Sequence, residues 1–139
     1  MLIDKLKPGL RHSETLTVEK NLTVPGLAAL VFREFNNMPP VFATAYMIGF
    51  IEWTCAEALK PYLGSHERSV GIHVNMSHSA ATPIGMKVTA EVELVEVNDR
   101  RLRFKVMCRD EVEVIGEGYH ERFIIDYEKF LSRVHAKGG

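Results

Sequence analysis

The fold of this chain depends on the segment Pro39-Pro40-Val41-Phe42-Ala43-Thr44-Ala45-Tyr46-Met47-Ile48-Gly49-Phe50-Ile51-Glu52-Trp53-Thr54-Cys55-Ala56. Between Phe42 and Ala56 it holds one charged residue, Glu52, and apolar residues occupy every side of the predicted helix. A helix that is apolar all round is typically buried inside a domain. The two prolines exclude a helix before this segment, and Pro61 ends it after about Leu59. The sequence therefore predicts one long buried helix.

Glu52 is the unusual residue of this helix. A buried carboxylate is costly unless it is paired, and apolar neighbours such as Phe50 and Trp53 are expected to raise its pKa. One interpretation is a nucleophile or general base that attacks a carbonyl carbon directly or through water. The alternative is a carboxylate that reaches solvent at a crevice or pairs with a core arginine.

Downstream of the helix the apolar period changes from helical to alternating, which predicts strands at about 70–78, 86–95, 101–109 and 112–127. A slip in the alternation at Leu94-Val95 predicts a bulge, and Asn98-Asp99-Arg100 predicts a hairpin turn. In the first of these strands one face is expected to carry Val70, Ile72, Val74, Met76 and His78, and the other His73, Asn75 and Ser77.

The whole chain, residues 1–139, is predicted to form a single α+β domain. A sheet with one apolar face needs a cover, so we expect a curved antiparallel sheet wrapped around the long central helix. A further strand is expected within 9–22, after a turn at Pro25-Gly26 a lid-like segment or brief helix at about 25–40, and a helical tail at about 128–139.

Composition excludes several classes of partner. The 17 basic and 18 acidic residues nearly cancel and form no basic block, so no nucleic-acid partner is expected. The longest apolar run is too short to span a bilayer and the first residues lack a signal-peptide core, which predicts a cytoplasmic protein with no membrane partner. Cys55 and Cys108 lack metal-like spacing and are predicted to be free buried thiols, and no metal site or cofactor is expected.

Three motifs resemble those of hot-dog-fold acyl-CoA thioesterases, most closely the fluoroacetyl-CoA thioesterase family. They are Val41-Phe42-Ala43-Thr44 with Met47-Ile48-Gly49-Phe50-Ile51-Glu52-Trp53, His78-Ser79-Ala80-Ala81-Thr82-Pro83-Ile84-Gly85, and His120-Glu121-Arg122. The similarity covers about residues 38–131. It implies a hot-dog fold and a homodimer, or a higher oligomer built from it, with the active site at the dimer interface. It also implies hydrolysis of a short-chain acyl-CoA, with coenzyme A entering as part of the substrate.

The resemblance assigns catalysis to Thr44, Glu52 and His78, and substrate binding to Gly71 and Arg122. From the residues alone, His78 is either a proton shuttle or a satisfied core histidine, and Thr44 is most simply an N-cap of the helix. The functional alternative for Thr44 is a hydroxyl that orients the carboxylate or the substrate carbonyl. Eight residues of continuous helix would separate Thr44 from Glu52 by about 12 Å, so Thr44 either lies in a non-helical approach that folds back or acts on another part of the substrate.

The substrate-binding candidates also have structural alternatives. Gly71 would otherwise mark a bulge or a tight sheet contact, and Arg122 an outer-face ion pair with Glu121 or Glu91. The fluoroacetyl-specific member of the family has an aromatic lid residue six positions before its catalytic threonine. The corresponding position of this chain is Met38, which is not aromatic.

Two further groups of residues each have two interpretations. Phe35, Met38 and Phe42 are candidates for a cover over an acyl pocket, with ordinary core packing as the alternative. The basic cluster Arg100, Arg101, Arg103 and Lys105 either meets CoA phosphates or lines a solvated strand face. Two rival functions stay open: a non-catalytic acyl-CoA or small-ligand binding protein, and an enoyl-CoA hydratase.

Overall fold

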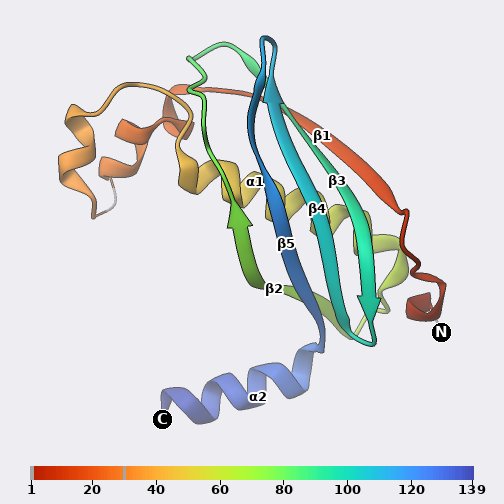
Figure 1. Ribbon diagram of the computed structural model, residues 1–139. Helices are drawn as coiled ribbons and strands as arrows, with labels where there is room; N and C mark the ends of the chain where they lie inside the picture. The colour runs from red at the N-terminus through yellow and green to blue at the C-terminus, as the bar shows by residue number, and fades with distance from the viewer. Residues whose placement is uncertain (1, 30) are drawn as a thin grey trace.

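The computed structural model describes residues 2–29 and 31–139. Within these residues a five-stranded antiparallel sheet, in the order β1-β3-β4-β5-β2, curls around the central helix α1 (Figure 1). The strands are β1 Arg11–Thr17, β2 Glu67–Met76, β3 Lys87–Asn98, β4 Arg101–Asp110 and β5 Val114–Asp126, and the helices are α1 Thr44–Leu59 and α2 Tyr127–Gly138. The predicted α+β architecture, a curved sheet around one long helix, is confirmed.

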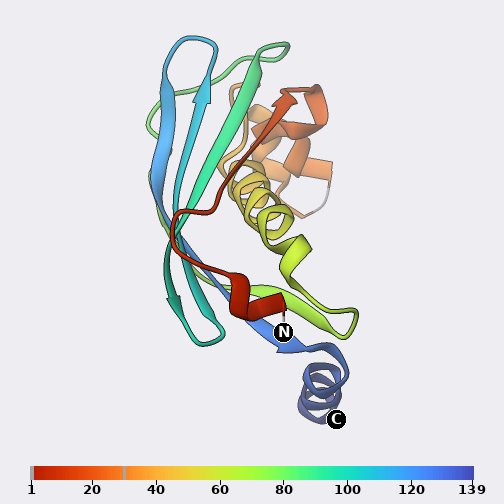
Figure 2. The ribbon, with the colours of Figure 1, turned by 90° about the vertical axis from the view of Figure 1, so that its right-hand side faces the viewer.

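The core lies between α1 and the concave face of the sheet (Figure 2). The helix contributes Met47, Ile51 and Cys55, each at most 1% exposed. The alternating residues of β3 and β4 meet them, namely Val88, Ala90, Val92, Leu94, Leu102, Phe104, Val106 and Cys108. The period-two pattern thus predicted the buried face of these strands correctly, and Cys55 and Cys108 are free buried thiols as expected.

The prediction that α1 is buried on all sides is wrong for the single chain. The sheet covers one side of the helix, and Ala45, Gly49 and Trp53 lie on an exposed flank. Trp53 is 48% exposed although it is large and apolar. The physical reason is that one sheet can wrap only part of a helix circumference, so an apolar flank is left without a cover in one chain.

The predicted faces of β2 are also partly wrong. The register of β2 against β5 shifts between Gly71 and His73, so Ile72 is the extra residue of a β-bulge. One extra residue exchanges the two faces of a strand. Val70 therefore lies beside the exposed Phe123 on the outer face, whereas Val74 lies beside the buried His120 on the inner face. The bulge places Gly71 on the inner face, and β2 ends before His78 is reached.

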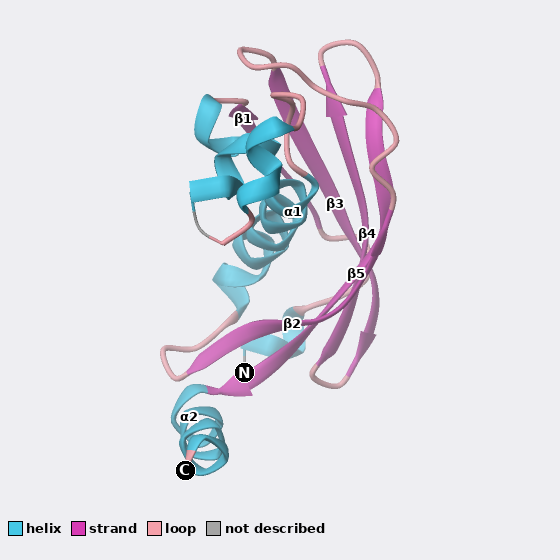
Figure 3. Ribbon diagram, turned by 90° about the vertical axis from the view of Figure 1, so that its left-hand side faces the viewer, coloured by secondary structure: helices cyan, strands magenta, loops and turns pink. Residues whose placement is uncertain are grey.

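The connections agree with several expectations. A register shift between Leu94 and Glu96 confirms the predicted bulge of β3, and the β3–β4 hairpin turns at Asp99, whose φ is 58°. The lid-like segment contains two short 3-10 helices at Val24–Ala29 and Arg33–Asn37, and a further one at Lys20–Leu22 precedes it; all lie beside the first turns of α1 (Figure 3). The turn expected at Pro25-Gly26 is therefore part of a 3-10 helix.

The helical tail is confirmed as α2, which extends away from the end of β5 (Figure 1). The Asp126 carboxylate caps it by accepting a hydrogen bond from the Lys129 N–H. Lys60–Tyr62 continues α1 as a 3-10 turn past Pro61, and a 3-10 helix at Leu2–Lys5 precedes β1. Of the described helices, none has the length and apolar character needed to cross a bilayer.

Candidate active site

Thr44 and His78 form one pair at the start of α1. Thr44 Oγ1 lies 2.6 Å from His78 Nδ1, which is a short hydrogen bond between two side chains 34 residues apart in the chain. Ala43 occupies the N-cap position and Thr44 is the first residue of the helix, so the N-cap interpretation of Thr44 is wrong. The hydroxyl instead fixes the orientation of the imidazole.

His78 lies in the loop that follows β2, half-buried beside the ring of Phe42. Burial lowers the pKa of His78 below its ordinary value because it disfavours the imidazolium, and the nearby backbone of Ala80 offsets only part of this. Nε2 is enclosed and has no hydrogen-bond partner within the described part of the chain. The imidazole is therefore neutral near pH 7 and has one nitrogen left for a reacting group.

Glu52 and Arg122 form a second pair, about two turns further along α1. The guanidinium Nη1 of Arg122 donates to Glu52 Oε1 at 3.3 Å. The Glu52 side chain is 43% exposed in the single chain, so the predicted burial of this carboxylate is wrong, whereas the pairing with a core arginine is confirmed. Its flank of α1 is the one that the sheet does not cover.

Arg122 is buried on the inner face of β5 and is held by several acceptors. Nε donates to Ser69 Oγ at 2.8 Å and Nη2 donates to the Ser69 carbonyl oxygen at 2.9 Å. The outer-face alternative for Arg122 is wrong, because Glu121 binds Arg101 and Arg103 and Glu91 binds Arg109. The guanidinium therefore faces α1 with a fixed orientation.

Gly71 completes this second cluster. A Cβ at this position would lie 2.6 Å from Glu52 Oε1 and 3.5 Å from Arg122 Nη1. Real Cβ atoms do not approach oxygen so closely, and only glycine leaves room for the carboxylate here. Gly71 also begins the bulge of β2, so the structural alternative and the functional interpretation describe the same residue.

His120 is a member of the second cluster that the sequence interpretation did not assign. Its Nε2 lies 3.2 Å from Arg122 Nη1, and its Nδ1 lies 2.8 Å from the His73 carbonyl oxygen. Burial lowers the pKa of His120, and the charge of Arg122 lowers it further against the opposing effect of the His73 carbonyl. The sequence could have indicated this role, because His120 lies two residues before Arg122 and residues two apart on a strand share a face.

The three residues predicted to cover an acyl pocket lie in different environments. Phe42 is a core residue whose ring lies edge-on to the ring of His78, with the two ring centroids 6.5 Å apart. Phe35 and Met38 lie on the surface of the 3-10 segment, 36% and 47% exposed, and Phe35 packs against Phe32. The single chain therefore does not bring Phe35, Met38 and Phe42 together as one buried cover.

The three arginines of the basic cluster, at the start of β4, are engaged in ion pairs. Arg101 and Arg103 both bind the Glu121 carboxylate, at 2.7 and 2.6 Å, and Arg100 lies 3.4 Å from Glu67. Arg103 also lies over the ring of Tyr119. These contacts favour the strand-face interpretation over a site for CoA phosphates.

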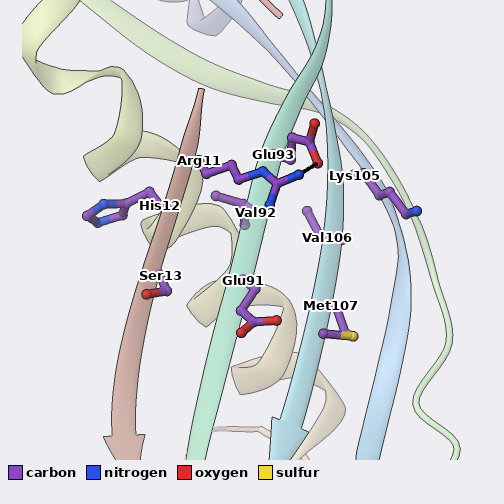
Figure 4. Close-up of a pocket in the computed structure, with 9 residues that line it drawn as sticks. All are labelled: Arg11, His12, Ser13, Glu91, Val92, Glu93, Lys105, Val106 and Met107. Carbon is purple, nitrogen blue, oxygen red and sulfur yellow. Dashed lines mark ion pairs between the residues drawn. The ribbon is translucent and has the colours of Figure 1, made fainter. Parts of the chain in front are cut away.

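A surface hollow over β1, β3 and β4 is separate from the candidate catalytic residues, although Lys105 of the basic cluster lines it (Figure 4). Its side chains include Arg11, Glu91, Glu93 and Lys105, which alternate with core residues and thus face outward. The described residues contain no cluster of three or more His, Cys, Asp or Glu that could hold a metal ion.

Comparison with known proteins agrees with this fold. Residues 27–128 match the family described as fluoroacetyl-CoA-specific thioesterase. The fluoroacetyl-CoA thioesterase of Streptantibioticus cattleyicolor is 41% identical over 134 residues, which are 96% of each chain. A solved structure of the fluoroacetyl-CoA thioesterase FlK has a TM-score of 0.92 at 41% identity, over 96% of this chain and 98% of that one.

A hot-dog-like protein from Thermanaerovibrio acidaminovorans shares the fold, with a TM-score of 0.84 at 20% identity over 96% of this chain and 94% of that one. The curled antiparallel sheet around one helix, together with these matches, defines the class of the protein as a hot-dog-fold thioester hydrolase. Within that class, the chain belongs to the fluoroacetyl-CoA-specific thioesterase family.

Proposed function

We propose that this protein is a dimeric thioesterase that hydrolyses a short-chain acyl-CoA to the free acid and CoA. One observation carries the proposal: the candidate residues form two half-sites in one chain. Thr44 and His78 make the first, and Glu52, Gly71 and Arg122 make the second. About 12 Å of helix separates Thr44 from Glu52, so an acid and an imidazole that act on one carbonyl need a second copy.

The surface beside the half-sites supports association through this side of the molecule. β2 is an edge strand among the described strands, and its Ile72 and Val74 are 46% and 41% exposed. The exposed flank of α1 with Trp53 adjoins both half-sites. Exposed apolar residues next to an open strand edge are typical of an interface. In the proposed dimer, His78 of one copy and Glu52 of the other share an active site.

The reaction assigns each residue one role. In one route the Glu52 carboxylate takes a proton from a water that adds to the thioester carbonyl carbon, and the carbon–sulfur bond of the tetrahedral intermediate then breaks. In the other route the carboxylate itself adds, the carbon–sulfur bond breaks to leave an acyl anhydride on Glu52, and water then hydrolyses the anhydride. In both routes the CoA thiolate that leaves receives a proton. His78, which is neutral near pH 7, transfers protons through Nε2, while Thr44 holds Nδ1.

The remaining residues position the acyl group. Arg122 and the backbone of Gly71 lie beside the Glu52 carboxylate and can hold the acyl end of the substrate against it. N–H groups of the first turn of α1 are available to stabilise the oxyanion, because the helix start carries unpaired N–H groups and the positive end of the dipole.

The acyl group is proposed to be small. The curated relative, 41% identical, is a fluoroacetyl-CoA thioesterase. At the lid position this chain carries Met38, a flexible side chain that fills space less rigidly than an aromatic ring. Acetyl-CoA and fluoroacetyl-CoA are therefore the pair of substrates that best defines the selectivity of this site.

The test is steady-state hydrolysis of an acyl-CoA panel, from acetyl- and fluoroacetyl-CoA to longer chains, with the released thiol detected by a chromogenic reagent. Turnover with a small acyl group is expected. Tight binding without turnover across the panel would instead support a binding protein. Addition of water to the double bond of an enoyl-CoA, in place of thioester cleavage, would support a hydratase.

A further inference from the structure

His120 is a buried histidine in contact with a candidate substrate-binding residue. It lies on the inner face of β5, 0% exposed, between Phe104 of β4 and Val74 of β2. It takes no part in the proton transfers and the acyl binding proposed for the other residues. A polar side chain that is completely enclosed is retained only where its hydrogen bonds are satisfied, and both ring nitrogens of His120 have partners.

The two partners determine the tautomer of His120. The guanidinium Nη1 of Arg122 can only donate, so His120 Nε2 must accept at 3.2 Å. The His73 carbonyl oxygen can only accept, so Nδ1 carries the proton and donates at 2.8 Å. An imidazolium would direct an Nε2–H group at the guanidinium, and burial and the charge of Arg122 both lower the pKa of His120. His120 is therefore a neutral acceptor.

The consequence for Arg122 concerns one atom, Nη1. Its two N–H groups are divided between Glu52 Oε1 at 3.3 Å and His120 Nε2 at 3.2 Å. Nη1 is also the guanidinium atom nearest to the Cβ that Gly71 lacks. The contacts of Nε and Nη2 with Ser69 hold the other side of the group. Without His120, Nη1 would keep a partially exposed carboxylate as its acceptor.

We propose that His120 is a positioning residue, which holds Nη1 of Arg122 between Glu52 and Gly71 so that the guanidinium is presented to the acyl group. This inference rests on the proposed function for its catalytic consequence, but the geometry itself can be tested without turnover. The other ionisable groups that face His120 are Glu52 from α1 and His73 from β2, besides Arg122 of its own strand.

The kinetic test is a double-mutant cycle between His120 and Arg122. His120→Leu keeps the volume and removes the acceptor, whereas His120→Gln supplies an amide oxygen close to the position of Nε2. We expect His120→Leu to lower kcat/KM about tenfold or more and His120→Gln to restore most of it, because misplaced groups lose rate steeply. In an Arg122→Lys background the same leucine exchange should cost less than about twofold. Equal losses in both backgrounds would overturn the proposal, since they indicate a general packing effect.

A spectroscopic readout supports or overturns the proposal without any variant. Long-range proton–nitrogen correlation spectra of the unmodified protein should show His120 as the neutral Nδ1–H tautomer at pH 7. An Nε2–H tautomer or an imidazolium at that pH contradicts the geometry, and this measurement decides the matter if His120→Leu does not fold. His12→Leu, on the edge strand β1, is the matched control for the kinetics. If the unmodified protein hydrolyses no acyl-CoA, the proposed function fails, while the tautomer still tests the positioning.

Discussion

The Nη1 atom of Arg122 lies 3.3 Å from Oε1 of Glu52, so an acid from the central helix is paired with a guanidinium from β5 across 70 residues of sequence. The guanidinium is fixed in place by its hydrogen bonds with Ser69 and His120. The Glu52 carboxylate, by contrast, keeps part of its surface exposed. The carboxylate is thus oriented and remains accessible, which is what a nucleophile or general base requires.

The first prediction concerns the two reacting groups. Glu52→Gln and His78→Ala should each lower the hydrolysis rate of the best acyl-CoA substrate by about 10²-fold or more, because a lost acid or base typically costs 10²–10⁴-fold. The release of free thiol is the measurement. Glu57→Gln on the same helix, where Glu57 pairs with Lys60, is the control. Variants within about twofold of the unmodified rate would remove Glu52 and His78 from the mechanism.

The second prediction follows from the two half-sites. When inactive Glu52→Gln and inactive His78→Ala proteins are mixed and allowed to exchange subunits, one site of each mixed dimer regains both intact residues. About a quarter of the unmodified activity should return, because half of the dimers are mixed and half of their sites are intact. The activity of the mixture is compared with that of each parent alone. If no activity returns although an affinity tag on one variant recovers the other variant with it, both residues act from the same chain.

The third prediction concerns Gly71. A methyl group in Gly71→Ala would lie 2.6 Å from Glu52 Oε1, so the carboxylate must move. We expect kcat to fall by about 10²-fold, the scale of a misplacement near 1 Å, with little change in the melting temperature. Gly138→Ala near the end of α2, where a Cβ meets nothing within 4 Å, is the matched control. An active Gly71→Ala enzyme would show that this close approach does not matter for catalysis.

The fourth prediction concerns stability at acid pH. The pKa values of His78 and His120 are lowered in the folded protein from their ordinary value of 6.5, mainly by burial. Below pH 6.5 the unfolded chain therefore binds more protons than the folded one, and the free energy of unfolding should decrease as the pH falls. Urea unfolding between pH 7.5 and pH 5 measures this slope.

His120→Gln should make this slope shallower, because glutamine does not titrate, and His12→Gln on β1 is the control. The lowered pKa values of Asp110 and Glu121, whose ordinary values are 3.8 and 4.5, also reduce stability as the pH approaches 5 and below, but they do so equally in His120→Gln and in the unmodified protein. An unchanged slope in His120→Gln would show that His120 is not held neutral by the fold.

The local patterns of the sequence predicted much of the fold. The apolar run ending at Pro61 predicted α1, and the alternation in β3 and β4 predicted the buried face, because each depends on residues close together in the chain. The bulge at Leu94 was visible as a slip in that alternation. In β2 the apolar alternation continues through Ile72, so the bulge there left no such signal and Val70 was placed on the wrong face.

By itself the sequence determined the family, the central helix and the residue types available for thioester chemistry, since these depend on motifs and on local periodicity. Only the tertiary structure decided that Glu52 is partly exposed, that Arg122 faces inward, and that Thr44 with His78 stands apart from Glu52. The physical reason is that these relationships are set by strand register and by the limited part of α1 that one sheet can cover. Both arise from contacts between distant parts of the chain, which no local pattern contains.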